Sequence, residues 1–313
     1  MARPCGSRCP GDIGQMSRRG PGPLRPYPDA VTVRRDLRAR RVVLDVDTGI
    51  DDALALLYAT ASPALDLCGV TVVAGNVPVE VATRNSTAVL SHVGADHVPV
   101  AIGAGRTLSG SGPREGPTDH GADGLGGVRV RRGAAPSEHG PRSLLRSVAS
   151  DGPVTLVGLA PLTNLAVLAP MADDVVLVAG ELGGGEPAEP NAAHDPGATA
   201  RVLAAGRPLT LHVADVFERV SVRPDDVARL RSSGRAAAQL AGELLAVRRG
   251  HLVGDAGALV LITHPTLFRV ERRRMGMVGE HLTETPDGRW VDVVVDVDRE
   301  RAARTVVDAL LTA

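Results

Sequence analysis

Four aspartates lie within eight residues near the start of the regularly patterned part of the chain: Asp45, Asp47, Asp51 and Asp52. The apolar run 42–44 precedes them, and the apolar-rich stretch 53–58 follows. This order predicts a strand, a tight turn and a helix, which puts the carboxylates at the C-terminal end of a strand, where α/β sheets bind ligands. Carboxylates this close repel one another, and a hard cation is the simplest way to relieve that repulsion.

Each aspartate also has a purely structural interpretation. Asp51 and Asp52 would lie in the first turn of a helix, where the helix dipole favours negative charge. Asp45 and Asp47 would then be ordinary loop acids. The structural interpretation is favoured for any one of these residues taken alone, whereas the four together favour a metal site.

Further polar residues follow other predicted strands. Asn76 follows the strand 67–74 in a Gly-Asn pair, which by itself is ordinary turn chemistry. Thr163, in the segment PLTN after the strand 154–158, would normally cap a helix or bury its hydroxyl. His120 opens the glycine-rich segment HGADGLGG, which does not match a phosphate-binding G-x-x-x-x-G-K-[ST] loop. A solvated loop histidine is therefore an equal alternative for His120.

Two later segments carry more candidates. Glu189 and Asn191 lie in the segment EPNAAHDP, in which Asp195 and Pro196 have the pattern of a helix N-cap and first helical residue. Asp255 lies in the segment VGDAGA. These segments add acidic and amide groups to the candidate site.

Together these motifs resemble the calcium-dependent nucleoside hydrolases. DVDTGIDDALAL is similar to that family's N-terminal pattern DxDPGxDDA, with Thr48 in place of the proline, and the resemblance extends through most of residues 41–311. It implies a hydrolase that cleaves the N-glycosidic bond of a ribonucleoside to give free base and ribose. It also implies a role in purine or pyrimidine salvage and a homo-oligomer, either a dimer or a tetramer.

The resemblance implies which residues would hold the cofactor, Ca²⁺. The ligands would be the side chains of Asp47, Asp52 and Asp255 and the main-chain carbonyl of Thr163. Asp47 would also act as the general base that takes a proton from the Ca²⁺-activated water.

The resemblance also implies contacts with the substrate. Asp51, Asn76, Glu189 and Asn191 would bind ribose hydroxyls. His120, in a mobile loop over the substrate, would contact the ribose or the leaving base.

The chain departs from the family pattern around the base and the 5′ end of the sugar, and four positions are relevant to this. Gly254 stands where purine-handling members carry a histidine that protonates the base, and nearby His251 has the pattern of an exposed helix-end residue. Glu181 replaces a family glycine, and Gly183 lies near the usual asparagine that contacts the 5′-hydroxyl. These changes predict a modified or specialised nucleoside as substrate. The alternative is a non-catalytic Ca²⁺-dependent riboside-binding protein that has lost leaving-group activation.

The elements that must position these residues alternate between strand and helix, which predicts an α/β fold with an open, mostly parallel (mixed) sheet flanked by helices. The predicted early strands are 67–74, 98–102, 154–158, 175–179 and 209–213, and two late strands, 267–278 and 289–297, are expected to be antiparallel. The predicted helices are 77–93, 142–150, 161–169, a helix ending near 205, 225–231, 235–249 and 299–311. Residues 1–38 are rich in Pro, Gly and Arg and predict a disordered tail, and 39–313 predict a single nucleoside hydrolase-like domain.

The composition limits the class of protein. The 313 residues carry 35 Lys plus Arg against 36 Asp plus Glu, so nothing indicates a nucleic acid or a membrane surface as partner. The segment DxD also begins haloacid-dehalogenase-like phosphatases, but those require a lysine and this chain has none. No apolar run reaches transmembrane length and no secretory signal is visible, so we expect a cytoplasmic protein with a small-molecule nucleoside as partner.

Overall fold

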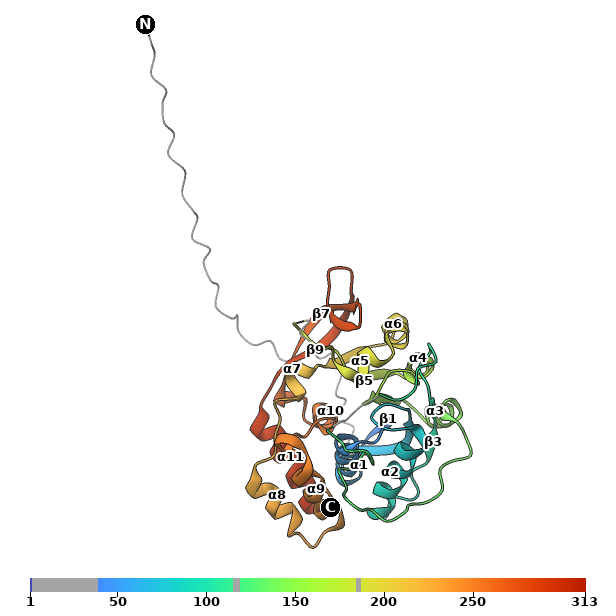
Figure 1. The fold of residues 1–313 in the computed structure, drawn as a ribbon, viewed down its shortest axis with the longest axis vertical. Coiled ribbons are helices and arrows are strands. Elements are labelled where there is room, and N and C mark those ends of the chain that lie inside the picture. The colour runs from blue at the N-terminus through green and yellow to red at the C-terminus, as the bar shows by residue number, and fades with distance from the viewer. Residues whose placement is uncertain (2–38, 115–118, 184–186) are drawn as a thin grey trace.

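One nine-stranded sheet organises the part of the chain that the structure describes, with the strand order β3-β2-β1-β4-β5-β6-β9-β7-β8. The computed structural model describes Met1 and residues 39–114, 119–183 and 187–313 (Figure 1). The predicted disordered tail, residues 1–38, lies outside the described residues except for Met1.

Seven neighbouring strands pair in parallel, as the alternation of strands and helices predicted. They are β3 (Val100–Ile102), β2 (Leu65–Val72), β1 (Arg40–Val46), β4 (Thr155–Gly158), β5 (Asp174–Val178), β6 (Leu209–His212) and β9 (Arg289–Val297). Both faces of such a sheet are covered, so its central strands are buried on both sides, as β1 is from Val42 to Val46 and β4 is throughout.

The far edge of the sheet makes it mixed. β7 (Phe268–Val278) pairs antiparallel with β9 and forms a hairpin with β8 (His281–Glu284), which projects at the top of Figure 1. The two late strands, β7 and β9, are antiparallel to each other as expected, and β9 also pairs in parallel with β6. β8 was not predicted, because its four residues are too short to show a strand period.

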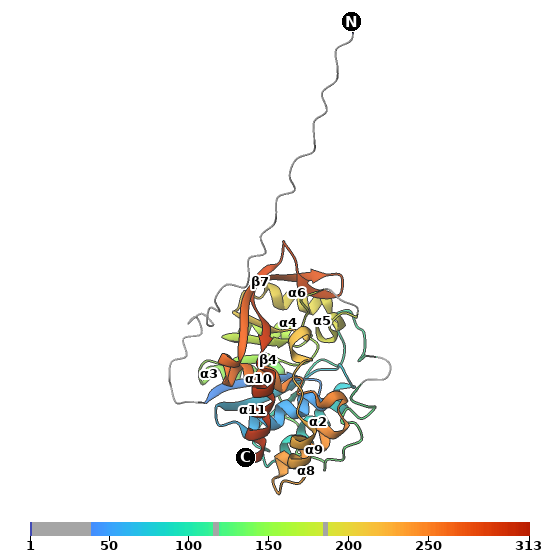
Figure 2. The same ribbon diagram turned by 90° about the vertical axis from the view of Figure 1, so that its left-hand side faces the viewer.

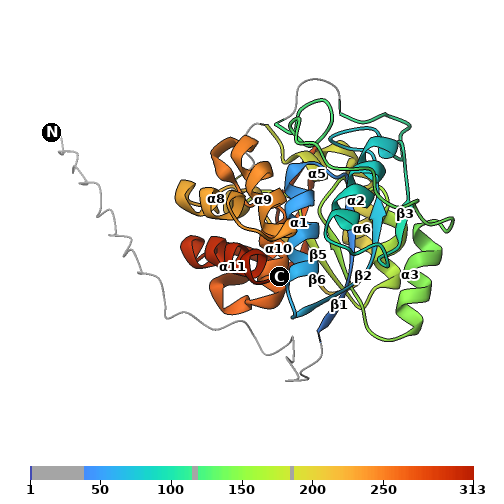
Figure 3. The same ribbon diagram turned by 90° about the horizontal axis from the view of Figure 1, so that it is seen from below.

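Helices cover both faces of the sheet. α1 (Ile50–Ala61) packs against α2 (Val79–His92), α9 (Ala236–Val247), α10 (Ala256–Thr263) and α11 (Arg299–Thr312), and α8 (Pro224–Arg231) extends this group (Figure 3). On the other face lie α3 (Pro141–Ser150), α4 (Leu165–Leu168) and α6 (Pro196–Ala204), and Figure 2 shows α5 (Pro190–His194) and α6 close to the β7–β8 hairpin. Short helical turns complete the chain at Ala169–Met171, Ala214–Phe217, Arg249–His251 and Pro265–Leu267. None of the helices in the described ranges is long and apolar enough to cross a membrane.

Three helical segments differ from the sequence prediction. The helix expected over 161–169 is only α4, because residues 162–164 form a turn before it and a 3₁₀ turn with Pro170 follows it. The helix expected to end near 205 is α6, which begins after Asp195 as predicted, whereas the short helix α5 before it was not predicted. α10 was missed because it is apolar on nearly every side, so its sequence carries no helical period.

Asn164 ties together the segments that carry the candidate site. Its Nδ2 donates to Asp45 Oδ1 at 2.8 Å and to the carbonyl of Val72 at 3.0 Å, while its Oδ1 accepts from the N–H of Ala104 at 2.9 Å. Asp45 Oδ1 also accepts a hydrogen bond from Thr71 of β2. These buried bonds link the ends of β1 and β2 to the segment after β4, so the sheet edge is a fixed platform.

His212, at the end of β6, is a buried histidine without a polar partner. Its ring lies edge-on to Phe217 and Phe268, with centroids 6.0 and 5.8 Å away. Neither ring nitrogen has a hydrogen-bond partner among the described residues. Burial lowers the pKa of His212 from 6.5 to about 4, so the ring is neutral in the folded protein at pH 7.

We expect His212→Phe to remove an acid-sensitive part of the stability. Between pH 6.5 and about 4 the unfolded chain binds a proton that folded His212 does not, so the wild type loses stability as the pH falls. That loss is about 3 kcal/mol. Urea unfolding at several pH values should show a smaller fall for His212→Phe, and the exposed control His139→Gln should follow the wild type. If the stability of His212→Phe fell with pH as much as that of the wild type, His212 would not be the source of the acid sensitivity.

Candidate active site

The turn between β1 and α1 is held by the side chain of Asp52. Its Oδ2 accepts from the N–H of Gly49 at 2.8 Å, and its Oδ1 accepts from the N–H of Asp47 at 3.3 Å. Asp52 therefore stabilises the start of α1 as a helix-capping acid does. Because the side chain is buried, the same carboxylate also faces the interior of the site.

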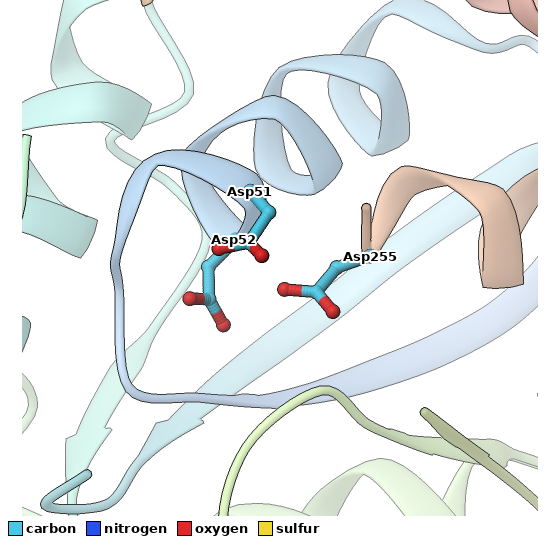
Figure 4. A group of neighbouring side chains, drawn as sticks. All are labelled: Asp51, Asp52 and Asp255. Carbon is cyan, nitrogen blue, oxygen red and sulfur yellow. The ribbon is translucent and has the colours of Figure 1, made fainter. Parts of the chain in front are cut away.

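Three aspartates form a group that can hold a metal ion. Asp51 and Asp52 at the start of α1 and Asp255 just before α10 each offer an oxygen within 4.8 Å of the others. Figure 4 shows Asp255 pointing towards the other two side chains. Burial and the neighbouring aspartates raise the pKa of Asp52 and Asp255 well above the usual range. A set of oxygen-only ligands with mutual repulsion fits a hard divalent cation.

Asp47 lies beside this group with its carboxylate bound elsewhere. It accepts hydrogen bonds from the backbone N–H of Asn76 and, at 3.3 Å, from Asn76 Nδ2. Arg114 Nη2 lies 3.6 Å from Asp47 Oδ2. Burial raises the pKa of Asp47, while Arg114 and the N–H of Asn76 oppose that rise.

The structure brings the four aspartates and Asn76 together, but the metal group has a different membership from the predicted ligand set. Asp51, predicted to bind substrate, belongs to the group of three oxygen donors, and Asp47 does not. The carbonyl of Thr163 accepts no hydrogen bond within the described ranges, while its hydroxyl donates to Asp195 Oδ2 at 2.8 Å. The roles of these residues as metal ligands therefore stay predictions.

Glu189 and Asn191 are tied into the fold around α5. Glu189 caps this helix and accepts three backbone N–H bonds, from Asn191 at 2.9 Å, Ala192 at 2.9 Å and Gly180 at 3.0 Å. Burial raises the pKa of Glu189 to about 7. Asn191 Nδ2 donates to two carbonyls, at 3.1 and 3.0 Å, and no hydrogen bond from the described residues reaches its Oδ1.

Asp195 is the helix N-cap that the sequence predicted. Its Oδ1 accepts from the N–H of Ala198 at 3.1 Å, within the first turn of α6. Its Oδ2 accepts from the N–H of Leu108 at 2.8 Å as well as from Thr163. The structural interpretation of this residue is confirmed.

His120 is buried, so the interpretation of a solvated loop histidine is wrong. Only 7% of the residue is exposed. Its Nδ1 accepts from the N–H of Ile50 at 3.1 Å and lies 3.5 Å from Asp51 Oδ1. The glycine-rich segment therefore reaches across the start of α1 and contacts the acidic group.

Two arginines of the site were not predicted. Arg114 Nη2 donates to Asn76 Oδ1 at 2.8 Å, and Arg248 Nη2 donates to Asp51 Oδ2 at 3.0 Å. The first lies in a long polar stretch and the second at the end of a helix, so neither belongs to a recognisable motif. In a chain whose basic residues are all arginine, these two carry no sequence signal of their own.

Gly254 has a backbone reason for being glycine. Its φ is +57°, and a Cβ at this position would lie 2.6 Å from the Cβ of Asp51. His251 does not replace a side chain here, because its Nδ1 lies 2.7 Å from the carbonyl oxygen of Leu245. Glu181, the other marked departure, is buried and accepts from the N–H of Glu189 at 3.0 Å while its Oε1 lies 2.6 Å from His281 Nδ1.

Comparison with known proteins identifies the family. The model of the inosine-uridine preferring nucleoside hydrolase family matches residues 42–309. The chain belongs to the inosine-uridine preferring nucleoside hydrolase family. It is thus an N-ribosylhydrolase, which cleaves ribonucleosides to base and ribose, and a non-catalytic binding role is not favoured.

Named relatives of this nucleoside hydrolase span most of the chain. It is 36% identical over 223 residues to the pyrimidine-specific ribonucleoside hydrolase RihA of Photobacterium profundum, covering 66% of this chain and 71% of the relative. It is 30% identical over 281 residues to uridine nucleosidase 1 of Arabidopsis thaliana, covering 80% of this chain and 83% of the relative. The solved structure of a purine-preferring ribonucleoside hydrolase from Gardnerella vaginalis matches with a TM-score of 0.79 and 23% identity, covering 87% of this chain and 98% of that one. This structural likeness confirms the predicted fold class.

We expect the acidic group to bind a divalent cation that Asp255→Asn releases. Without added cation, removing one of the mutually repelling charges should raise the melting temperature by about 2–4 °C, or about 1 kcal/mol in a chain of this size. In thermal melts with CaCl₂ or MgCl₂, the wild type should be stabilised and Asp255→Asn should not. The control Asp66→Asn, whose side chain is 56% exposed, should behave as the wild type. If added cation raised the melting temperature of Asp255→Asn as much as that of the wild type, the acidic group would not be the cation site.

Proposed function

We propose that this nucleoside hydrolase uses Ca²⁺ and that Asp47, Asp52, Asp255 and the carbonyl of Thr163 hold the ion. The observation that carries the proposal is the group Asp51, Asp52 and Asp255, whose oxygens lie within 4.8 Å of one another, with the buried Asp47 beside it. The donors are all hard oxygens, and a backbone carbonyl, such as that of Thr163, which accepts no hydrogen bond from the described residues, is a common calcium ligand. When bound, the ion would orient the sugar diol and lower the pKa of a water molecule.

Asp47 is the residue we assign as general base. It must be ionised to accept a proton from the attacking water, although burial favours its neutral form. Arg114, at 3.6 Å, and the N–H of Asn76 stabilise the ionised form. These contacts also fix the direction of the carboxylate, which is the geometric requirement for proton transfer.

Asp51, Asn76, Glu189 and Asn191 supply the contacts to the ribose hydroxyls. Asp51 and Asn76 lie beside the acidic group, and Asn191 Oδ1 is free of hydrogen bonds within the described ranges. A deoxyribose that lacks a hydroxyl would leave such buried groups unpaired, so discrimination between the two sugars is strong. His120, buried against Asp51, contacts the ribose or the base from the glycine-rich segment.

We further propose a specialised or modified nucleoside as the substrate, since Gly254 and Glu181 alter the base and 5′ ends of the site. The protein is proposed to be cytoplasmic, and the near balance of charge supports the absence of a nucleic acid or membrane partner. Membership of a nucleoside hydrolase family supports a role in purine or pyrimidine salvage, a single domain over 39–313 and a homo-oligomer, dimer or tetramer.

A reducing-sugar assay tests the activity and its ion. We expect purine, pyrimidine or nicotinamide ribosides to release free ribose, to do so no longer after chelation, and to recover when Ca²⁺ is restored. The reason is that the carboxylates repel one another without the ion, and the sugar diol loses its ligand. The proposal fails if no riboside releases ribose, or if release is indifferent to the chelator.

Asp47→Asn tests base catalysis while keeping an oxygen ligand for the ion. Asparagine retains the shape of the side chain and one oxygen that Ca²⁺ can bind, but it cannot take the proton, so kcat should fall by about 10²–10⁴-fold. Binding of D-ribose in the presence of Ca²⁺, followed by calorimetry, should remain detectable. The exposed Asp66→Asn should retain the wild-type kcat. If Asp47→Asn kept more than about a tenth of kcat, another group would be the base.

A further inference from the structure

Arg248 is a buried cation to which the proposed mechanism assigns no role. It follows the last residue of α9, and its side chain is 10% exposed. Its Nη2 donates to Asp51 Oδ2 at 3.0 Å. Its Nε and Nη1 are buried and have no hydrogen-bond partner among the described residues.

Unpartnered donors on a buried guanidinium are unfavourable. Arginine carries five N–H donors and cannot lose its charge, so burial leaves its free donors desolvated. The neighbouring Arg249 shows the ordinary alternative, because it is 74% exposed and pairs with Asp119 at 3.0 Å. Arg248 is kept inside although, in the part of the chain that the structure describes, just one of its nitrogens donates a hydrogen bond, which indicates an acceptor that a ligand supplies.

Arg248 lies where two walls of the site meet. The end of α9 is close to the glycine-rich segment, because a Cβ on Gly126 would lie 2.9 Å from Val247 Cγ2. Within this corner, His120 faces Oδ1 of Asp51 at 3.5 Å and Arg248 faces its Oδ2. Both groups lower the pKa of Asp51 although its burial opposes the change.

The two site arginines act on different carboxylates. Arg114 Nη2 lies 3.6 Å from Asp47 Oδ2 and donates to Asn76 Oδ1 at 2.8 Å. Arg248 Nη2 instead donates to Asp51 Oδ2 at 3.0 Å. Arg248 is therefore the arginine beside Asp51, and Arg114 is the arginine beside Asp47.

We propose that Arg248 binds the leaving base and stabilises the negative charge that the base acquires. The inference rests on the proposed function, in which Asp51 and Glu189 bind the sugar. Because Arg248 contacts Asp51, which binds the sugar in that function, we place the substituent on the anomeric carbon beside Arg248. The free Nε and Nη1 then donate to acceptor atoms on the base.

The proposed reaction needs no general acid from this chain to protonate the leaving base. The bond between the anomeric carbon and the base nitrogen breaks, and its electron pair stays on that nitrogen. Water oxygen bonds to the anomeric carbon, and one water proton passes to Asp47. The base departs as an anion paired with the Arg248 guanidinium and takes a proton from solvent afterwards. Arg248 stays protonated throughout, so it acts electrostatically.

Leaving-group dependence tests the assignment. With uridine, Arg248→Met should lower kcat/KM by about 10²-fold, the usual effect of losing a preorganised donor. With 4-nitrophenyl β-D-ribofuranoside, whose phenolate leaves unaided, the fall should be less than about 3-fold, because the charge needs no stabilisation. Arg249→Met is the matched control and should alter neither substrate. Arg248→Lys, which keeps the charge, should lie between Arg248→Met and the wild type.

An equal loss with both substrates would overturn the inference, because Arg248 would then act on the sugar through Asp51. Calorimetry gives a readout that does not need turnover, with pseudouridine as a C-riboside that cannot be cleaved and D-ribose as the sugar alone, both with Ca²⁺. Arg248→Met should weaken the binding of pseudouridine by about 10-fold and change the affinity for D-ribose by less than about 2-fold. Equal weakening of both ligands would again overturn it. A wild type that binds both ligands but cleaves no riboside would defeat the proposed function, and the calorimetric comparison would still decide the role of Arg248.

Discussion

The structure depends on how buried carboxylates are kept together at the end of β1. Asp47, Asp51, Asp52 and Asp255 lie close enough to shift one another's pKa, and burial raises the energy of every charge among them. Backbone N–H groups of the turn, Arg114 and Arg248 compensate only part of this. The remaining repulsion is the reason a cation suits the site, and the sheet edge supplies the rigidity that prevents the acids from separating.

Several residues serve the fold and the site at once. Asp52 holds the β1–α1 turn, and Glu189 caps α5, yet both carboxylates are buried next to candidate ligands or substrate contacts. The structural interpretation of these acids and the functional one are therefore compatible. Helix N-termini provide N–H groups that stabilise buried negative charge, so a carboxylate of the site is less destabilising there than elsewhere in the interior.

The order of elements around the site could be predicted from the sequence because it depends on local patterns. The apolar run before Asp45 and the acids that follow it indicate a strand, a turn and a helix without any knowledge of the rest of the chain. Asp195 could likewise be assigned as an N-cap from its neighbour Pro196. α10 could not be predicted, because a helix that is apolar on all sides has no period to detect.

The membership of the acidic group could be predicted only in part. That Asp255 meets Asp52 followed from the family resemblance, since no local pattern joins residues so far apart in the chain. Arg114 and Arg248 were missed because an arginine becomes a site residue only through tertiary contacts. The burial of His120 depends on how the glycine-rich segment folds over α1, which its composition does not specify.

The decisive experiment is a crystal structure with Ca²⁺ and ribose in which the ion is located by anomalous scattering. We expect one ion about 2.3–2.6 Å from carboxylate oxygens of Asp52 and Asp255, with the ribose diol completing its shell. An ion bound elsewhere, or a ribose that does not touch it, would show that the acidic group does not join cation and sugar.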